Sequence, residues 1–186
     1  MSYFLGFVVD KESRAKIREV AASIKQAFDD FGIPVRWSKP STYHITLYYL
    51  GERHSFLENL ILNKRVGDVE FESIDIKFGS VKVGISRNYK ELIYLDLKEG
   101  GEKLRELLLK LRKQLGQKDT SLFVPHLTLG RLSKEVSIQE YRNIVKDMSN
   151  MSKRLDISDI HFTAKELYLI ESKDGVYSFK MKFEAK

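Results

Sequence analysis

The chain has 186 residues, with 32 Lys and Arg residues against 26 Asp and Glu residues, a surplus of six positive charges. It has no cysteine, which excludes disulfide frameworks, thiol nucleophiles and cysteine-rich zinc sites. No apolar stretch approaches the roughly 20 residues of a membrane span, and the apolar N-terminus lacks the basic flank of a secretion signal. We therefore expect a cytoplasmic protein that folds as a single two-lobed domain, 1–186.

The positive surplus is weak evidence about partners. It is compatible with a polyanionic partner such as RNA, and a solvated basic surface accounts for it as well. Nothing in the composition implies a protein partner, so we expect a monomer.

The first half of the chain predicts a strand, a helix and a second strand. Residues 3–9 form an apolar run typical of a strand, and residues 11–31 repeat apolar positions at helical spacing. Gly32 predicts the end of that helix. A short extended piece at 35–37 then leads to a strand at 44–50.

The second half repeats this plan. Its pattern predicts strand material at 71–85, a strand at 92–97, a helix at 102–115, a strand at 123–132, a helix at 137–151 and two closing strands within 161–183. Similar units often pack about a pseudo-twofold axis, which would make equivalent strands face one another. Strand–helix–strand order is nevertheless common in mixed folds, so the motifs must decide.

Two copies of His-x-Thr-Leu lie on the last expected strand of each strand–helix–strand unit. They are His44 to Leu47 and His126 to Leu129. Side chains at i and i+2 of a strand share a face. We therefore expect each motif to present an imidazole and a threonine hydroxyl on one surface, with its apolar residues in the core.

This constellation suits acid–base work on a phosphate ester. A neutral histidine can take a proton from water while a protonated one donates to the leaving oxygen. The hydroxyls of Thr46 and Thr128 can bind non-bridging oxygens, and Arg131 adds a charged donor suited to phosphate. The sequence holds no metal-ligand motif, so we expect neither a metal nor a cofactor.

The chain resembles the two-histidine phosphoesterase superfamily, and within it the RNA 2',3'-cyclic phosphodiesterases, also called 2'-5' RNA ligases. The resemblance spans nearly the whole chain. Its specific segments are the opening strand with Phe4, Val35-Arg36-Trp37, Tyr43 to Leu47, Leu50-Gly51, Phe123 to Arg131, and Leu167 to Ser172 with Gly175 to Tyr177. The family often has a basic residue where Tyr48 stands here.

The resemblance implies a bilobal α+β fold, a pseudo-twofold duplication in which two antiparallel sheets flank a central cleft with helices on the outer faces. It implies metal-independent conversion of an RNA-terminal 2',3'-cyclic phosphate, tRNA fragments included, to a 2'-phosphate. His44 would protonate the 3'-oxygen and His126 would activate water. Reverse 2'-5' ligation follows from microscopic reversibility.

Four further residues are candidates for contact with RNA. Trp37 and Phe4 would stack on a base or be buried aromatics, and Arg36 would bind a second phosphate or carry a solvated charge. Tyr48 and Tyr49 alternate faces, so at most one reaches the cleft, and we name Tyr48. The other histidines, His54 and His161, are expected to be structural or solvent-facing.

Two other functions remain open from the sequence. One is an RNA-binding module with the same cleft and little turnover, although a binder has no need of paired imidazoles. The other is a phosphodiesterase that acts on small cyclic nucleotides or on 2'-5' oligoadenylate, since these present a phosphate ester to the same histidines.

Overall fold

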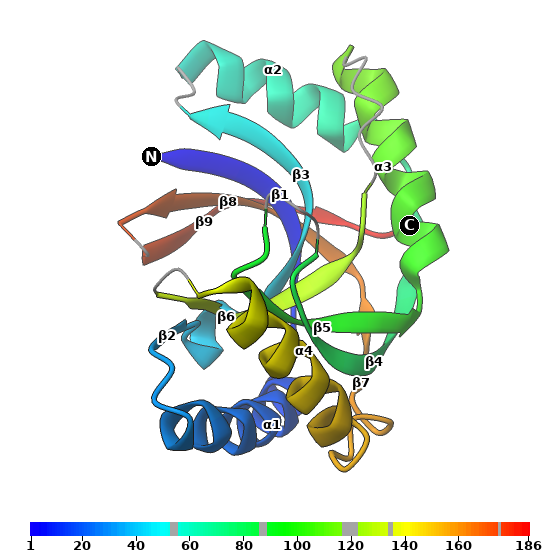
Figure 1. Ribbon diagram of the computed structural model, residues 1–186. Coiled ribbons are helices and arrows are strands. Elements are labelled where there is room, and N and C mark those ends of the chain that lie inside the picture. The colour runs from blue at the N-terminus through cyan, green and yellow to red at the C-terminus, as the bar shows by residue number, and fades with distance from the viewer. Residues whose placement is uncertain (53–55, 86–88, 117–122, 134–135, 175) are drawn as a thin grey trace.

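The computed structural model describes the chain except residues 53–55, 86–88, 117–122, 134–135 and 175, and except the side chains of residues 56–60. Its described part combines helices with one antiparallel sheet (Figure 1). In chain order the elements are β1 (Ser2–Val8), α1 (Lys11–Asp30), β2 (Val35–Trp37), the 3-10 turn η1 (Pro40–Thr42), β3 (His44–Glu52), α2 (Phe56–Gly67), β4 (Ile74–Val83), β5 (Leu92–Glu99), α3 (Gly101–Leu115), β6 (His126–Leu132), α4 (Ile138–Ser152), β7 (His161–Ala164), β8 (Glu166–Lys173) and β9 (Val176–Glu184).

The sheet consists of two halves that meet in the middle of the strand order β7-β4-β5-β6-β3-β1-β8-β9. The halves join where β6 lies antiparallel to β3, at the pair Ile45 and Leu127. Further along β6 its partner is β2. The α+β fold is thereby confirmed, and the two expected sheets are the two halves of this one curled sheet.

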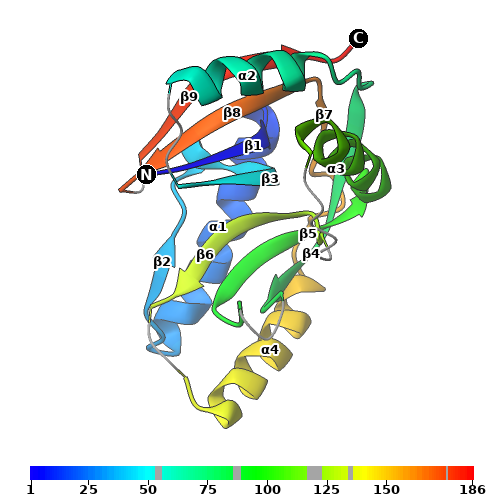
Figure 2. The same cartoon turned by 90° about the horizontal axis from the view of Figure 1, so that it is seen from above.

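Helices cover the sheet at both ends of the molecule (Figures 1 and 2). Helices α2 and α3 lie side by side near one end, and α1 and α4 lie near the other. Helix α1 begins because the Asp10 side chain accepts a hydrogen bond from the Ser13 amide at 2.8 Å. It buries Ile17, Val20, Ile24 and Phe28 in a hydrophobic core that reaches both halves.

The closing strands differ from the sequence prediction. Residues 161–183 were expected to form two strands, and the segment instead contains β7, β8 and all of β9 except its last residue. Strand β7 pairs with β4 in one half, whereas β8 pairs with β1 in the other. The chain therefore crosses from one half of the sheet to the other at Lys165, the single residue between β7 and β8. The apolar pattern of the sequence continues through this point and does not predict the crossing. Helix α2 was also not predicted.

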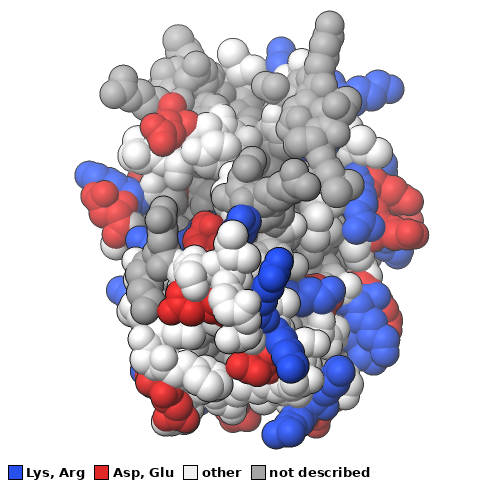
Figure 3. Space-filling model, in the orientation of Figure 1, with Lys and Arg blue, Asp and Glu red and all other residues white. Residues whose placement is uncertain are grey.

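The face of the molecule drawn in Figure 3 carries charges of both signs. On the face drawn in Figure 3, basic and acidic side chains are interspersed, with a group of Lys and Arg side chains toward the lower right. Within the described residues, no helix is both long and apolar enough to cross a membrane.

Candidate active site

The two histidines are the first residues of β3 and β6, the strands at which the halves of the sheet meet. Ile45 and Leu127 pair directly there and are fully buried. Because side chains alternate along a strand, His44 and His126 project from the opposite face. Continuing the register by one residue puts His44 opposite Thr128. The two imidazoles and two hydroxyls therefore share one surface.

Both motif strands carry a β-bulge directly after the threonine. Gly6 pairs with Thr46 and Leu5 with Tyr48, so Leu47 is the extra residue on β3. Likewise Tyr94 pairs with Thr128 and Ile93 with Gly130, so Leu129 is the extra residue on β6. A bulge reverses the alternation beyond it. Residues after the bulge therefore lie on the face opposite to the one that strict alternation predicts.

The bulge on β6 places Arg131 beside the histidines. Counted strictly from His126, Arg131 would point into the core. The extra residue turns it to the face of His126 and Thr128, opposite Leu92 of β5. There its Nη1 donates to Glu91 Oε1 at 2.6 Å. The structure thus brings the five expected residues of the phosphate site together.

The His44 ring is held by a carbonyl, a hydroxyl and two aromatic rings. Its Nδ1 lies 2.7 Å from the Thr42 carbonyl oxygen, which can only accept, so Nδ1 carries the proton. Its Nε2 lies 3.1 Å from Thr46 Oγ1. Phe4 stacks on the ring at 4.8 Å between centroids, and Tyr177 meets it edge-on at 5.2 Å.

The His126 ring is anchored in the same way. Its Nδ1 donates to the Val124 carbonyl oxygen at 2.8 Å, and Tyr94 of β5 meets the ring edge-on at 5.5 Å. In both motifs the carbonyl two residues before the histidine fixes Nδ1 as the protonated nitrogen of the neutral ring. Each Nε2 is consequently the atom available for proton transfer.

Both imidazoles have a lowered pKa. Burial is the main cause at each ring, because it disfavours the charged form. The hydrogen bonds to Thr42 and Val124 partly oppose it. The charge of His126 further lowers the pKa of His44, and the Arg131 guanidinium further lowers the pKa of His126. These charge effects reflect how closely the three groups are gathered.

The aromatic candidates differ in how far they are exposed. After the bulge, Tyr48 pairs with Leu5 and packs half-buried against the core, so its contact with RNA stays an untested prediction. Tyr49 takes the face of the histidines, opposite Phe4, and is 56% exposed. Phe4 is only 6% exposed beneath His44. Trp37 is half-buried and packs edge-on against Phe28 of α1 at 5.9 Å. Phe4 thus matches the buried alternative, and the contact of Trp37 with a base stays a prediction.

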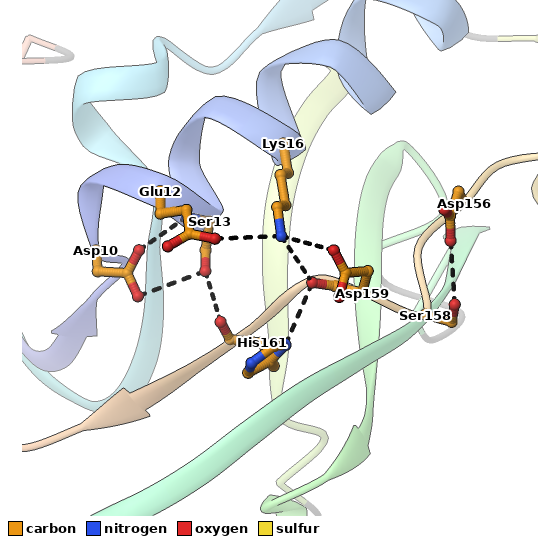
Figure 4. Close-up of polar contacts among 8 residues, drawn as sticks. All are labelled: Asp10, Glu12, Ser13, Lys16, Asp156, Ser158, Asp159 and His161. Atoms are coloured by element: carbon orange, nitrogen blue, oxygen red, sulfur yellow. Dashed lines mark hydrogen bonds and ion pairs between the residues drawn. The ribbon is translucent and has the colours of Figure 1, made fainter.

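The remaining histidines are separate from this site. His161 starts β7 at the outer edge of the sheet and is exposed, as expected. It has Thr163 two residues on, but that hydroxyl donates to Asp75. Figure 4 shows its surroundings: Ser13 donates to the His161 carbonyl oxygen, and Lys16 bonds Asp159. His54 lies outside the described residues.

Three residues of the site were missed by sequence reasoning. Tyr94 and Tyr177 contact the histidine rings, and Glu91 holds Arg131. Tyr177 lies in a segment that carries the family resemblance, which could have pointed to it. Tyr94 and Glu91 reach the site only through the pairing of β5 with β6, for which the sequence offers no signal.

The described residues contain no group of three or more His, Cys, Asp or Glu side chains that could hold a metal ion. The chemically active groups at the junction are instead imidazoles, hydroxyls and a guanidinium. That set can transfer protons and bind an anion.

Comparison with known sequences finds one family. The model of the family described as the 2'-5' RNA ligase superfamily matches residues 43–176. A protein of Aquifex aeolicus (strain VF5) named RNA 2',3'-cyclic phosphodiesterase is 25% identical, over 89% of this chain and 96% of that protein. A protein of the same name from Archaeoglobus fulgidus is 28% identical, over 82% of this chain and 83% of that protein.

Comparison with solved structures finds the same fold. LigT of E. coli in its apo form superposes with a TM-score of 0.71 at 19% identity, covering 99% of this chain and 96% of that chain. Its complex with 3'-AMP gives a TM-score of 0.70 at 18% identity, covering 99% and 97%.

Proposed function

Because the chain belongs to the 2'-5' RNA ligase superfamily, we propose that it is an RNA 2',3'-cyclic phosphodiesterase. It hydrolyses the terminal 2',3'-cyclic phosphate of RNA, tRNA fragments included, to a 2'-phosphate without a metal ion. One observation carries the proposal: His44 and His126 share one surface, each with its Nδ1 bonded to a carbonyl and its Nε2 left for proton transfer. The names of two relatives support the same reaction.

The reaction balances with these groups alone. His126 Nε2 takes a proton from water as the water oxygen bonds to phosphorus. The bond from phosphorus to the 3'-oxygen breaks, and His44 Nε2–H protonates that oxygen. The products are a 2'-phosphate and a free 3'-hydroxyl. We assign the acid to His44 and the base to His126 on the family resemblance.

Hydroxyls and a cation bind the non-bridging oxygens. Thr46 and Thr128 donate hydrogen bonds to them, and Arg131 offsets the negative charge that the phosphate carries through the transition state. The bound phosphate also raises the pKa of the imidazoles, which burial lowers in the free protein. Substrate binding thereby favours the protonated His44 that the leaving oxygen requires.

The reverse reaction uses the same groups. A 5'-hydroxyl in place of water attacks the cyclic phosphate and forms a 2'-5' linkage, while His126 takes its proton. We further propose that the protein acts as a monomer, a single two-lobed domain in the cytoplasm. No metal or cofactor takes part in either direction.

The decisive experiment follows an oligoribonucleotide that ends in a 2',3'-cyclic phosphate by phosphorus NMR, in the presence of EDTA. The intact protein should convert it to a 2'-phosphate. His44→Ala and His126→Ala should each lose at least about a hundredfold in rate, the typical contribution of a positioned acid or base. His161→Ala is the matched control, because His161 has the same spacing to a threonine but lies at the outer edge. Its rate should be unchanged.

Other results would redirect the proposal. Turnover that is abolished by EDTA and restored by a divalent metal would rule out this mechanism. RNA binding without turnover would point to a binding module. Turnover of small cyclic nucleotides or 2'-5' oligoadenylate alone would keep the chemistry and change the substrate.

A further inference from the structure

Two arginines face each other at the end of the cleft surface. Arg36 of β2 pairs directly with Arg131 of β6, and the neighbouring pair is Trp37 with Gly130. Trp37 packs toward Phe28 of α1. Because side chains alternate, Arg36 projects from the opposite face. That face is the one on which Arg131 lies near His126.

The charge of this pair is only half balanced. Like charges directly opposite each other in a sheet are destabilising. Arg131 has the Glu91 carboxylate at 2.6 Å. Arg36 is exposed, and within the described part of the chain no side-chain hydrogen bond or ion pair is recorded for it. Among the described residues, two cations and one carboxylate leave one positive charge at a surface beside the catalytic groups, which an anion would stabilise.

The position of β2 relates this charge to the phosphate site. Strand β3 pairs with β6 at Leu127, and β2 takes its place along β6 from Gly130 to Leu132. Arg36 therefore lies farther along the same face than His126 and Thr128, with Arg131 at its side. An RNA chain whose terminal cyclic phosphate lies between the histidines also has a second phosphate group, one nucleotide before the end.

On the basis of the proposed function, we infer that Arg36 binds the phosphodiester that precedes the terminal cyclic phosphate. Arg131 lies between the two phosphates and contacts the terminal one. The site then selects oligoribonucleotides over 2',3'-cyclic mononucleotides, because only an oligonucleotide supplies the second anion.

Three substrates isolate this contact. Adenosine 2',3'-cyclic phosphate has one phosphate, and the dinucleotide ApA with a 2',3'-cyclic end has two. The same dinucleotide with a methylphosphonate linkage keeps the second nucleoside but loses its charge. The intact protein should prefer the charged dinucleotide over both others by about tenfold in kcat/KM, as expected for a charge-assisted hydrogen bond.

Arg36→Gln should abolish that preference and leave the mononucleotide rate unchanged. For the charged dinucleotide, the negative slope of log kcat/KM against log salt concentration should become less steep by about 0.7, the value for one phosphate contact on a single strand. Arg36→Lys should retain the slope because it keeps the charge. Arg18→Gln on the exposed side of α1 removes the same charge elsewhere and should change nothing.

The outcomes separate this inference from the proposed function. Equal rates for the three substrates, or an unchanged preference in Arg36→Gln, would overturn the inference and leave the phosphodiesterase intact. If the intact protein turns over none of them, the proposed function fails. Binding of the 2'-phosphorylated mononucleotide and dinucleotide, measured by calorimetry, then decides the inference. It holds if Arg36→Gln weakens only the dinucleotide, and fails if both bind alike.

Discussion

Ile45 and Leu127 pair across β3 and β6, and each is the second residue of its His-x-Thr-Leu motif. The pair therefore lies on the local twofold relation between the halves. The pair also sets the distance between the two imidazoles, because each histidine immediately precedes its member of the pair on the same strand. The apolar residues of the motifs thus align the two histidines from the buried face of the sheet.

We expect Ile45→Ala and Leu127→Ala each to lower the free energy of unfolding by about 2–5 kcal/mol, since both residues are fully buried. Because the residues pair directly, the double variant should deviate from additivity by about 0.5–3 kcal/mol. Denaturant unfolding measures all three. Phe162→Ala on the distant β7 should combine additively with Ile45→Ala, and equal coupling for both pairs would contradict this account of the junction.

Gly6→Ala should impair activity through the backbone of β3. A Cβ at Gly6 would lie 2.8 Å from the Ile45 carbonyl oxygen, so β3 must move away from β1. We expect a loss of about 1–3 kcal/mol in stability, as for overpacking, together with a lower kcat. Gly67→Ala, where a Cβ meets nothing within 4 Å, is the control. Full activity of Gly6→Ala would show that the register does not constrain His44.

The pH dependence of kcat/KM should reflect the lowered pKa of both histidines. The reaction needs one protonated imidazole, and both free imidazoles lose their proton below the ordinary value of 6.5. The maximum of kcat/KM should therefore lie below about pH 6.5. Arg131→Gln removes a positive charge that lowers the pKa of His126. One limb of the profile should then move to higher pH, while the overall rate falls.

Acid should destabilise the fold through the same groups. A histidine whose pKa is lower in the folded state binds more protons when unfolded. The stability it contributes is present above the unfolded pKa of about 6.5 and is lost as the pH falls through the folded pKa. Thermal unfolding between pH 7 and pH 5 should show a smaller acid-induced drop in Tm for His44→Gln than for the intact protein. An identical drop would place the pH dependence on other groups.

The two adjacent tyrosines should respond differently to substitution. Tyr49 is exposed on the cleft face, so Tyr49→Ala should weaken binding of an oligoribonucleotide by up to about 1–3 kcal/mol, the range for a stacked base. Tyr48 packs against the core, so Tyr48→Ala should lower the Tm and leave binding unchanged. Fluorescence titration and thermal unfolding on the same samples test both. The opposite pattern would mean that β3 has no bulge in solution.

The sequence by itself predicted the candidate catalytic residues of this protein. Two short His-x-Thr-Leu motifs pointed to His44, Thr46, His126 and Thr128. The histidine and threonine of each motif are two residues apart, and a strand places such side chains on one face whatever surrounds it. Local patterns also predicted α1, α3 and α4 to within two residues at each end. These features depend only on residues that are close together in the sequence, so they can be predicted from the sequence alone.

Tertiary structure decided which other residues join the motifs. Arg131 and Tyr49 lie on the face of the histidines because each motif strand has an extra residue directly after its threonine. Tyr94 and Tyr177 reach the histidines from other strands, and Glu91 reaches Arg131 from the turn before β5. A bulge is a property of two paired strands, and neither strand alone records where the extra residue lies.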